Sequence, residues 1–234
     1  MEYGDPHVEA SPVWRSGVVL LFGRCTPSAL AGPVAFVLAI STISVLRFEH
    51  ILNAPQLAVS PRRVAEGKVW LLVTSGMIAT RPAVLALTSF ALLAVTVVLV
   101  CGPRIFWTAT LLGHFGGTGL SYLVLALARA SDPSDHAGLV TRLDFGVSAM
   151  QGAWLGAIAA ALWLRSAHSV ARRIEIAAAC AAVGLVAYLA KPGLTILDVD
   201  HGFAFIIGIG LVTGARPAKL LPHGLRARTD ARTV

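Results

Sequence analysis

Residues 142–154, RLDFGVSAMQGAW, lead into a 20-residue stretch without a charged side chain, from Phe145 to Leu164. About 20 apolar residues are long enough to cross a bilayer as a helix. Ser148 lies about one helical turn inside this stretch. A serine there is either a small packing residue bonded to its own helix backbone or a nucleophile held within the membrane. The rest of the sequence has to distinguish these two interpretations.

The overall composition indicates a membrane protein. Of the 234 residues, 56% are hydrophobic and only 13% are charged, which is far too apolar for a soluble domain of this size. The three cysteines have no paired spacing, so they predict neither a disulfide framework nor a zinc site. We therefore expect an all-α polytopic membrane protein that uses no metal and no cofactor.

Six apolar stretches have a length suited to spanning a bilayer. The fifth is the shortest, and Glu175 at its start can extend it by snorkelling. We predict a six-helix membrane domain over residues 25–215, preceded by an N-terminal segment, 1–24, and followed by a basic tail, 216–234. The six stretches are 25–46, 82–103, 105–128, 145–164, 176–190 and 194–215.

A further apolar segment, VWLLVTSGMIA at residues 69–79, is too short to span. We expect it to form short helical pieces at the membrane interface after the first span, with Trp70 at the depth of the headgroups. Pro82 argues against one continuous helix from this segment into the second span, because proline lacks the backbone donor and disfavours helix in the preceding residue.

The distribution of Lys and Arg predicts the orientation. In a six-span topology, the side with both termini and the 2–3 and 4–5 loops carries eleven Lys and Arg and five acids. The opposite side carries eight and seven. We therefore predict that both termini are cytoplasmic. The net charge of +7 then reflects topology and contact with anionic lipid, and we expect no nucleic-acid partner.

Polar residues near the outer ends of the fourth and sixth spans form the candidate site. Ser148 and His201 enter from the same side and lie at similar depth, as a Ser–His dyad requires. Ionisable residues within spans are costly and are functional candidates by default. Asp198, three residues before His201, shares its helical face and could orient the imidazole. Alternatively, His201 is a structural residue bonded to a backbone carbonyl, and Asp198 and Asp200 are solvated above the span.

Small residues favour close packing of these two spans. Gly152 and Gly156 form a G-x-x-x-G pattern in the fourth span, and Gly210 and Gly214 form a second pattern in the sixth. Such spacings allow helix backbones to approach one another in lipid. We expect both patterns to contribute to helix contacts.

His114, in LLGHFGGTG, is a separate polar residue in the middle of the third span. Its ring could contact Thr118, four residues later on the same helical face. Alternatively, it could contribute to a polar cavity.

Taken together, these motifs resemble the rhomboid family of intramembrane serine proteases, over about residues 31–215. Rhomboids carry a G-x-S-G/A nucleophile motif at the start of the fourth of six spans, which GVSA, Gly146 to Ala149, matches. Their catalytic histidine lies in an H-x-x-G-x-x-x-G pattern in the sixth span. HGFAFIIG keeps His201 and Gly208, with Ala204 at the inner glycine.

Other motifs match in part. The stretch GKVWLLVTS resembles the rhomboid G-x-x-W-R-L-x-T motif of the long first connection, except that Leu71 replaces the arginine. The sequence D-x-G-x-S, from Asp144 to Ser148, and D-x-x-H, from Asp198 to His201, resemble a divergent actinobacterial rhomboid-like group. The resemblance implies Ser148 and His201 as the catalytic pair, with Asp144, Gly146 and Asp198 in supporting positions.

The chain departs from rhomboids at the groups that bind the oxyanion. Rhomboids place H-x-x-x-N near the start of the second span, but RPAVLALTS has neither residue. Each oxyanion donor is worth about 10²–10³ in rate. A protease of this sequence would depend on the backbone N–H of Ser148 and on Gln151. The family's tyrosine four residues after the nucleophile is replaced by Gly152.

Three functions follow from these observations. The first is an intramembrane serine endopeptidase that cleaves membrane-embedded proteins. The second is a rhomboid-like pseudoenzyme that binds client transmembrane helices without cleaving them, which would account for the missing oxyanion pair. The third is a small transporter with a polar pathway along His114, Asp198 and His201, although no inverted repeat or broken-helix pair supports it.

Overall fold

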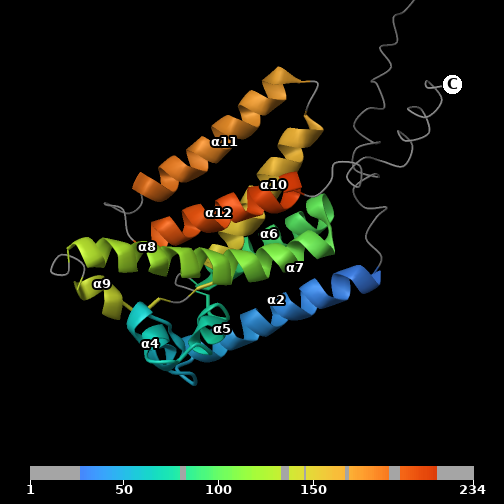
Figure 1. Ribbon diagram of the computed structural model, residues 1–234. Helices are drawn as coiled ribbons and strands as arrows, with labels where there is room; N and C mark the ends of the chain where they lie inside the picture. Colours follow the sequence, from blue (N-terminus) through green and yellow to red (C-terminus); the bar gives the residue numbers. More distant parts are fainter. Residues whose placement is uncertain are drawn as a thin grey trace, which may run out of the picture.

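The computed structural model describes residues 27–79, 83–132, 137–144, 146–166, 169–189 and 196–214, so the predicted segments 1–24 and 216–234 lie outside the described residues. Within these ranges every named element is a helix (Figure 1). The long helices are α2 (Pro27–Phe48), α6 (Ala83–Cys101), α7 (Pro103–Leu111), α8 (Gly117–Ser131), α10 (Ser148–Arg165), α11 (Val170–Leu189) and α12 (Ile196–Gly214). A π-helical turn, η1 (Leu112–Gly116), joins α7 to α8, and the short helices are α3 (Ala54–Leu57), α4 (Pro61–Ala65), α5 (Leu71–Ser75) and α9 (Ala137–Thr141).

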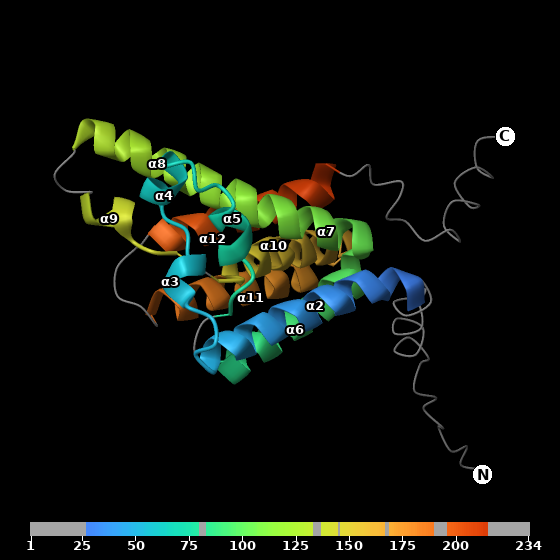
Figure 2. The ribbon, with the colours of Figure 1, turned by 90° about the horizontal axis from the view of Figure 1, so that it is seen from below.

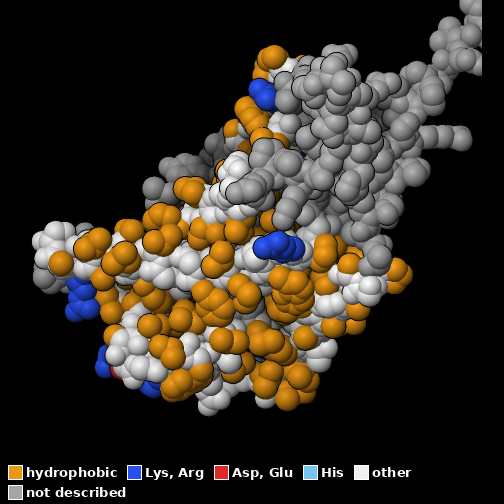
Figure 3. All heavy atoms as spheres, turned by 45° about the vertical axis from the view of Figure 1, so that its right-hand side comes forward, with side chains coloured by type: hydrophobic (Ala, Val, Ile, Leu, Met, Phe, Trp, Pro, Cys, Tyr) orange, Lys and Arg blue, Asp and Glu red, His pale blue; other side chains and the backbone are white. Residues whose placement is uncertain are grey.

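Four helical stretches of the described chain are long and apolar enough to cross a membrane: Pro27–Phe48, Val84–Cys101, Pro103–Ser131 and Leu197–Gly214. Their side chains are mostly not buried within the protein, and hydrophobic atoms cover much of the surface in Figure 3. Apolar surface on this scale indicates an integral membrane protein. The α-helical class predicted from the sequence is therefore confirmed.

Helices α10 and α11 do not meet the same test of length and hydropathy, for two different reasons. Helix α10 is rich in alanine and glycine and packs against α6, α7, η1, α11 and α12. Because other helices cover much of its surface, it needs fewer strongly apolar side chains than a helix that faces lipid. Helix α11 carries charges in its first two turns, at Arg172, Arg173 and Glu175. It lies at the edge of the bundle, where it packs chiefly against α10 (Figure 1).

An aromatic cluster fixes α10 within the bundle. The Trp154 ring is fully buried, stacks on Phe106 at 5.1 Å between centroids and lies 5.0 Å from Phe90. Its Nε1–H donates to the Thr110 hydroxyl at 3.1 Å, so the polar end of the indole is also satisfied. These contacts join α10 to α6 and α7 and set the rotation of the helix that begins at Ser148.

The contact between α10 and α12 depends on glycine. A Cβ atom on Gly156 would collide with the Phe205 carbonyl, and one on Gly208 would collide with the Ala153 carbonyl. Gly210 and Gly214, by contrast, have open space around them. The prediction that Gly152 and Gly156 allow close packing is therefore confirmed, whereas the prediction for Gly210 and Gly214 is wrong. The packing face of α12 passes through Gly208.

The chain between α2 and α6 is broken into short pieces, as expected for residues 69–79. Helix α5 ends at Ser75 and α6 begins only at Ala83, so the two do not form one helix. The short helices α3, α4 and α5 lie between α2 and α8 (Figures 1 and 2). Arg47 at the end of α2 donates to the Ala79 carbonyl at 2.7 Å and fixes the far end of this segment.

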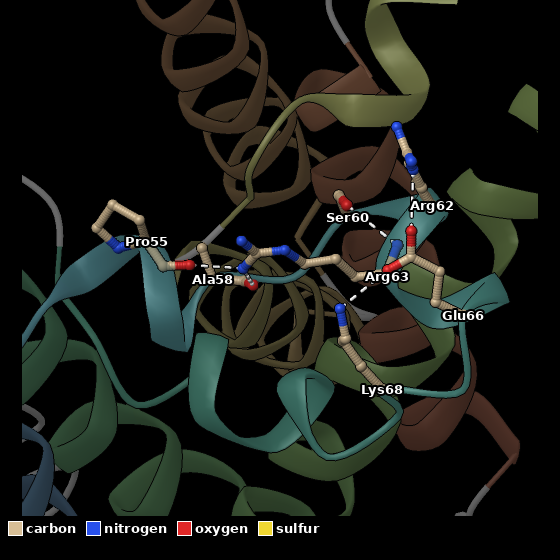
Figure 4. A network of polar contacts seen from close by, with 7 residues as sticks. All are labelled: Pro55, Ala58, Ser60, Arg62, Arg63, Glu66 and Lys68. Atoms are coloured by element: carbon tan, nitrogen blue, oxygen red, sulfur yellow. Dashed lines mark hydrogen bonds and ion pairs between the residues drawn. The ribbon is translucent and has the colours of Figure 1, made fainter.

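Polar contacts hold the α3–α4 part of this connection together (Figure 4). The Arg63 guanidinium donates to the carbonyls of Pro55, at 2.5 Å, and Ala58, at 2.8 Å. Ser60 caps α4 by accepting from the Arg63 N–H at 3.2 Å. On the outside, Glu66 pairs with Arg62 and with Lys68, each at 2.9 Å. The connection is thus an ordered structural unit.

Candidate active site

Ser148 and His201 meet across the contact between α10 and α12. Ser148 Oγ lies 2.8 Å from His201 Nε2. Ser148 is the first residue of α10, and His201 is in the second turn of α12. Both are partly buried. The predicted proximity of these two side chains is therefore present in the structure.

The distance suits a hydrogen bond in which the serine hydroxyl donates to the imidazole. This direction requires the neutral ring with its proton on Nδ1, because Nε2 then carries the lone pair. A histidine in this arrangement can accept the hydroxyl proton as the oxygen attacks a carbonyl carbon. The distance would allow Ser148 to act as a nucleophile with His201 as its general base.

The backbone before Ser148 has a shape that only glycine adopts easily. Gly146 has φ +142°, in the region that residues with a Cβ rarely occupy. Its N–H donates to the Ser75 carbonyl at 2.9 Å, and Asp144 forms an antiparallel bridge with Val59. The connection after α2 therefore holds the segment that leads into α10. Gly146, predicted as a supporting residue, acts through the backbone.

The N-terminus of α10 provides backbone donors beside Ser148. No side chain caps this helix at Val147, and its first internal bond runs from the Gln151 N–H to the Val147 carbonyl. The N–H groups of the first turn have no acceptor within the helix, and the helix dipole places partial positive charge there. Such donors can stabilise negative charge that develops on an attacked carbonyl oxygen.

Gln151 lies one turn after Ser148, on the same side of α10. Its Nε2 donates to the Ser89 hydroxyl of α6 at 3.2 Å, which leaves the second hydrogen of the amide for another acceptor. Gln151 was expected to contribute from the sequence, whereas Ser89 was not. The adjacent hydroxyls of Thr88 and Ser89 in LALTSF, within a largely apolar stretch, were the available signal.

Asp198 and Asp200 of α12 lie in different surroundings. Asp198 is half-buried in the first turn of α12. Asp200 is buried, with 5% of its surface exposed, and lines a small pocket with Asp144 on the α8 side of α12. The alternative that both aspartates of α12 are solvated above the span is therefore wrong for Asp200. The carboxyl belongs to a separate polar region, described below.

His114 does not bond to Thr118. Its Nε2 lies 2.5 Å from the Leu72 carbonyl of α5, and its Nδ1 is buried without a partner among the described residues. The wider turn of η1 shifts the helical register at His114, so the expected spacing to residue 118 does not apply. Gly76 allows this contact, because a Cβ atom there would lie 2.6 Å from His114 Nε2. His114 thus connects α5 to the third span.

In the described part of the chain, no group of three or more His, Cys, Asp or Glu side chains is arranged to hold a metal ion.

Comparisons with known proteins identify no relative. No family model matches the chain, and neither a curated protein nor a solved structure matches it.

Proposed function

We propose that this protein is a rhomboid-like intramembrane serine endopeptidase, with Ser148 as the nucleophile and His201 as the general base. The observation that carries the proposal is the 2.8 Å separation of Ser148 Oγ and His201 Nε2. Both residues also occupy motif positions of that family. The substrates would be transmembrane segments of other proteins, entering from the lipid.

The proposed reaction has two halves. As Oγ of Ser148 bonds to the scissile carbonyl carbon, His201 takes the hydroxyl proton at Nε2. The imidazolium then gives this proton to the amide nitrogen, the C–N bond breaks, and an acyl-enzyme remains. Water repeats the sequence: His201 takes a proton from water, the hydroxide adds to the ester carbon, and Ser148 leaves with the proton restored.

The oxyanion would be held by groups other than those of rhomboids. The backbone N–H groups at the start of α10 are one set of donors, and the Gln151 amide is the other. Gln151 is oriented by Ser89, so less of its side-chain freedom has to be lost when the oxyanion forms. This arrangement substitutes for the missing histidine and asparagine of the second span.

The membrane topology belongs to the same proposal. Helices α10 and α11 would complete a set of six spans, with α11 shielding part of α10 from lipid. The segment around α5 would lie at the outer interface, where the exposed Trp70 suits headgroup depth. Both termini would be cytoplasmic in a cell membrane, from the distribution of Lys and Arg.

A second candidate is a pseudoenzyme that binds client transmembrane helices without cleaving them. One observation favours it: α6 contributes Ser89 to this region and has neither the histidine nor the asparagine of active rhomboids. In that case the Ser148–His201 pair would be a structural hydrogen bond between two spans.

Labelling with a fluorophosphonate probe tests the proposal. The purified full-length protein should be labelled on Ser148, because only a serine activated by a base reacts readily. Ser148→Ala and His201→Ala should each lose the label, while Ser131→Ala, which removes an exposed hydroxyl at the end of α8, should retain it. An unlabelled wild-type protein with a normal thermal transition would favour the pseudoenzyme.

A further inference from the structure

Beside the dyad, α12 carries a buried carboxyl on a different face. Asp200 directly precedes His201, but it faces Gly117 and Thr118 of α8. A Cβ atom on Gly117 would lie only 2.6 Å from Asp200 Oδ1, so the glycine makes room for the carboxyl. Residue 117 therefore allows α8 and α12 to approach around a polar group.

Asp200 lines a small cavity together with other oxygen-bearing side chains. The cavity has a volume of about 10 Å³. That is room for about one water molecule or one ion of similar size. The oxygen-bearing side chains in its wall are those of Thr118, Ser121, Tyr122, Asp144 and Asp200.

Three of these oxygens lack a hydrogen-bond partner within the described residues: Asp200 Oδ1, Ser121 Oγ and Tyr122 Oη. Asp200 is 5% exposed and Ser121 is 1% exposed, so solvent outside the protein does not satisfy them. Buried polar groups in native proteins nearly always have partners. An occupant of the cavity would supply the missing contacts.

Charge distinguishes between the possible occupants. No ion pair to Asp200 occurs in the described ranges, and Asp144 adds a second negative charge to the cavity wall. A carboxylate removed from water either takes up a proton or is stabilised by a compensating charge. Water would satisfy the hydrogen bonds but not the charge. Arg142, in the wall of the same cavity, is exposed and is the competing source of positive charge.

We propose that this cavity binds one small monovalent cation, coordinated by Asp200 and the hydroxyl oxygens of Ser121 and Tyr122. Hard cations prefer oxygen ligands of this type. One coordinating carboxylate and two hydroxyls suit one positive charge, Asp144 adds negative charge nearby, and the cavity has room for only one ion. The site is separate from the Ser148–His201 pair and does not depend on whether the protein is a protease.

The test uses sodium as the probe and the purified full-length protein in detergent. Thermal unfolding is measured at constant ionic strength while sodium chloride replaces choline chloride, whose cation is too large for the cavity. At ten times the dissociation constant, sodium should raise the midpoint by roughly 3–6 °C. Ser121→Ala and Asp200→Asn should reduce or abolish this shift.

Two controls make the result specific. Asp198→Asn removes a carboxylate from the same helix but not from the cavity wall, so it should keep the sodium response. Arg142→Gln should keep or strengthen it. If Asp200→Asn fails to fold, binding of radioactive sodium to the wild type gives the stoichiometry, which should be one. Equal midpoints in sodium and choline, or a response that survives Asp200→Asn, would overturn the proposal.

Discussion

The two sides of α12 differ in whether their polar groups have hydrogen-bond partners. Toward α10, the His201 ring meets the Ser148 hydroxyl at 2.8 Å, and glycines bring the backbones into contact. Toward α8, Asp200 Oδ1 and Ser121 Oγ are buried without partners among the described residues. Asp200 and His201 are adjacent in the sequence, and the helix turns their side chains about 100° apart. His201 therefore meets the Ser148 hydroxyl, whereas Asp200 faces the cavity.

This difference has a physical consequence. The α10 side owes its geometry to backbone contacts, which cannot adjust to added volume. The α8 side owes its geometry mainly to side chains that can move and to the occupant of the cavity beside Asp200. Substitutions on the α10 side should therefore have large effects on stability and chemistry, and substitutions on the α8 side should have smaller ones that depend on solution conditions.

The largest effect is expected for Gly208→Val. The new side chain would collide with the Ala153 backbone and separate α12 from α10, which should lower the free energy of unfolding by about 3 kcal/mol or more. Probe labelling of Ser148 should be lost as well. Gly210→Val, two residues away in open space, is the matched control and should leave both properties nearly unchanged. Similar behaviour of the two variants would contradict the packing described for α12.

Gln151→Leu should impair the chemistry more than the fold. Removing one oxyanion donor costs about 10²–10³ in turnover. Ser89→Ala should have a smaller effect in the same direction, because it frees the amide without removing it. Turnover of a cleavable substrate together with thermal midpoints separates the two effects. Unchanged turnover in Gln151→Leu would leave the backbone N–H groups as the oxyanion donors.

Gly117→Ala tests the α8 side. The added methyl group would lie 2.6 Å from Asp200 Oδ1 and 3.1 Å from the Asp200 backbone carbonyl. The Asp200 side chain can rotate away at a cost of about 0.5–1.5 kcal/mol, and the backbone contact is much looser than the one at Gly208. Labelling of Ser148 should persist, in contrast to Gly208→Val. A loss of labelling as complete as in Gly208→Val would mean that the two sides of α12 are not independent.

The smallest effect is expected at the surface of the α4 connection. The Lys68 hydrogen bond, followed by that of Arg62, holds the pKa of Glu66 below its usual value. A lowered folded-state pKa stabilises the protein above the unfolded-state pKa, and this stability is lost as the pH falls through the folded-state value. Because Glu66 is exposed, Glu66→Gln should barely change the thermal midpoint at pH 7. A shift as large as that of Gly117→Ala would show that the connection is more tightly coupled to the bundle than these contacts imply.

The helix positions were predictable because apolar stretches between charges follow the membrane rules closely. The meeting of Ser148 and His201 was predictable because each lies near the start of its helix and the predicted topology has both helices enter from the same side. The rotation of α12 about its own axis was not predictable, because periodicity alone does not identify the neighbouring helix. Gly210 was therefore predicted at the contact that Gly208 occupies.

Other features of the site depended on local detail. The π-helical turn at His114 changes its register, and nothing in LLGHFGG indicates that turn. Ser121 and Tyr122 follow Thr118 by three and four residues, so a polar stripe on one face of α8 could have been recognised. What the sequence could not provide was the position of Asp200 opposite that stripe.

We propose that the pair formed by Ser148 and His201 cleaves peptide bonds within the membrane. The most direct test reconstitutes the purified protein in liposomes with a model substrate that has one transmembrane segment, and measures the mass of any products. We expect products cut within or next to that segment for the wild type, and at least about 10³-fold less product for Ser148→Ala. Equal cleavage by Ser148→Ala, or none by a wild-type protein that unfolds cooperatively, would contradict it.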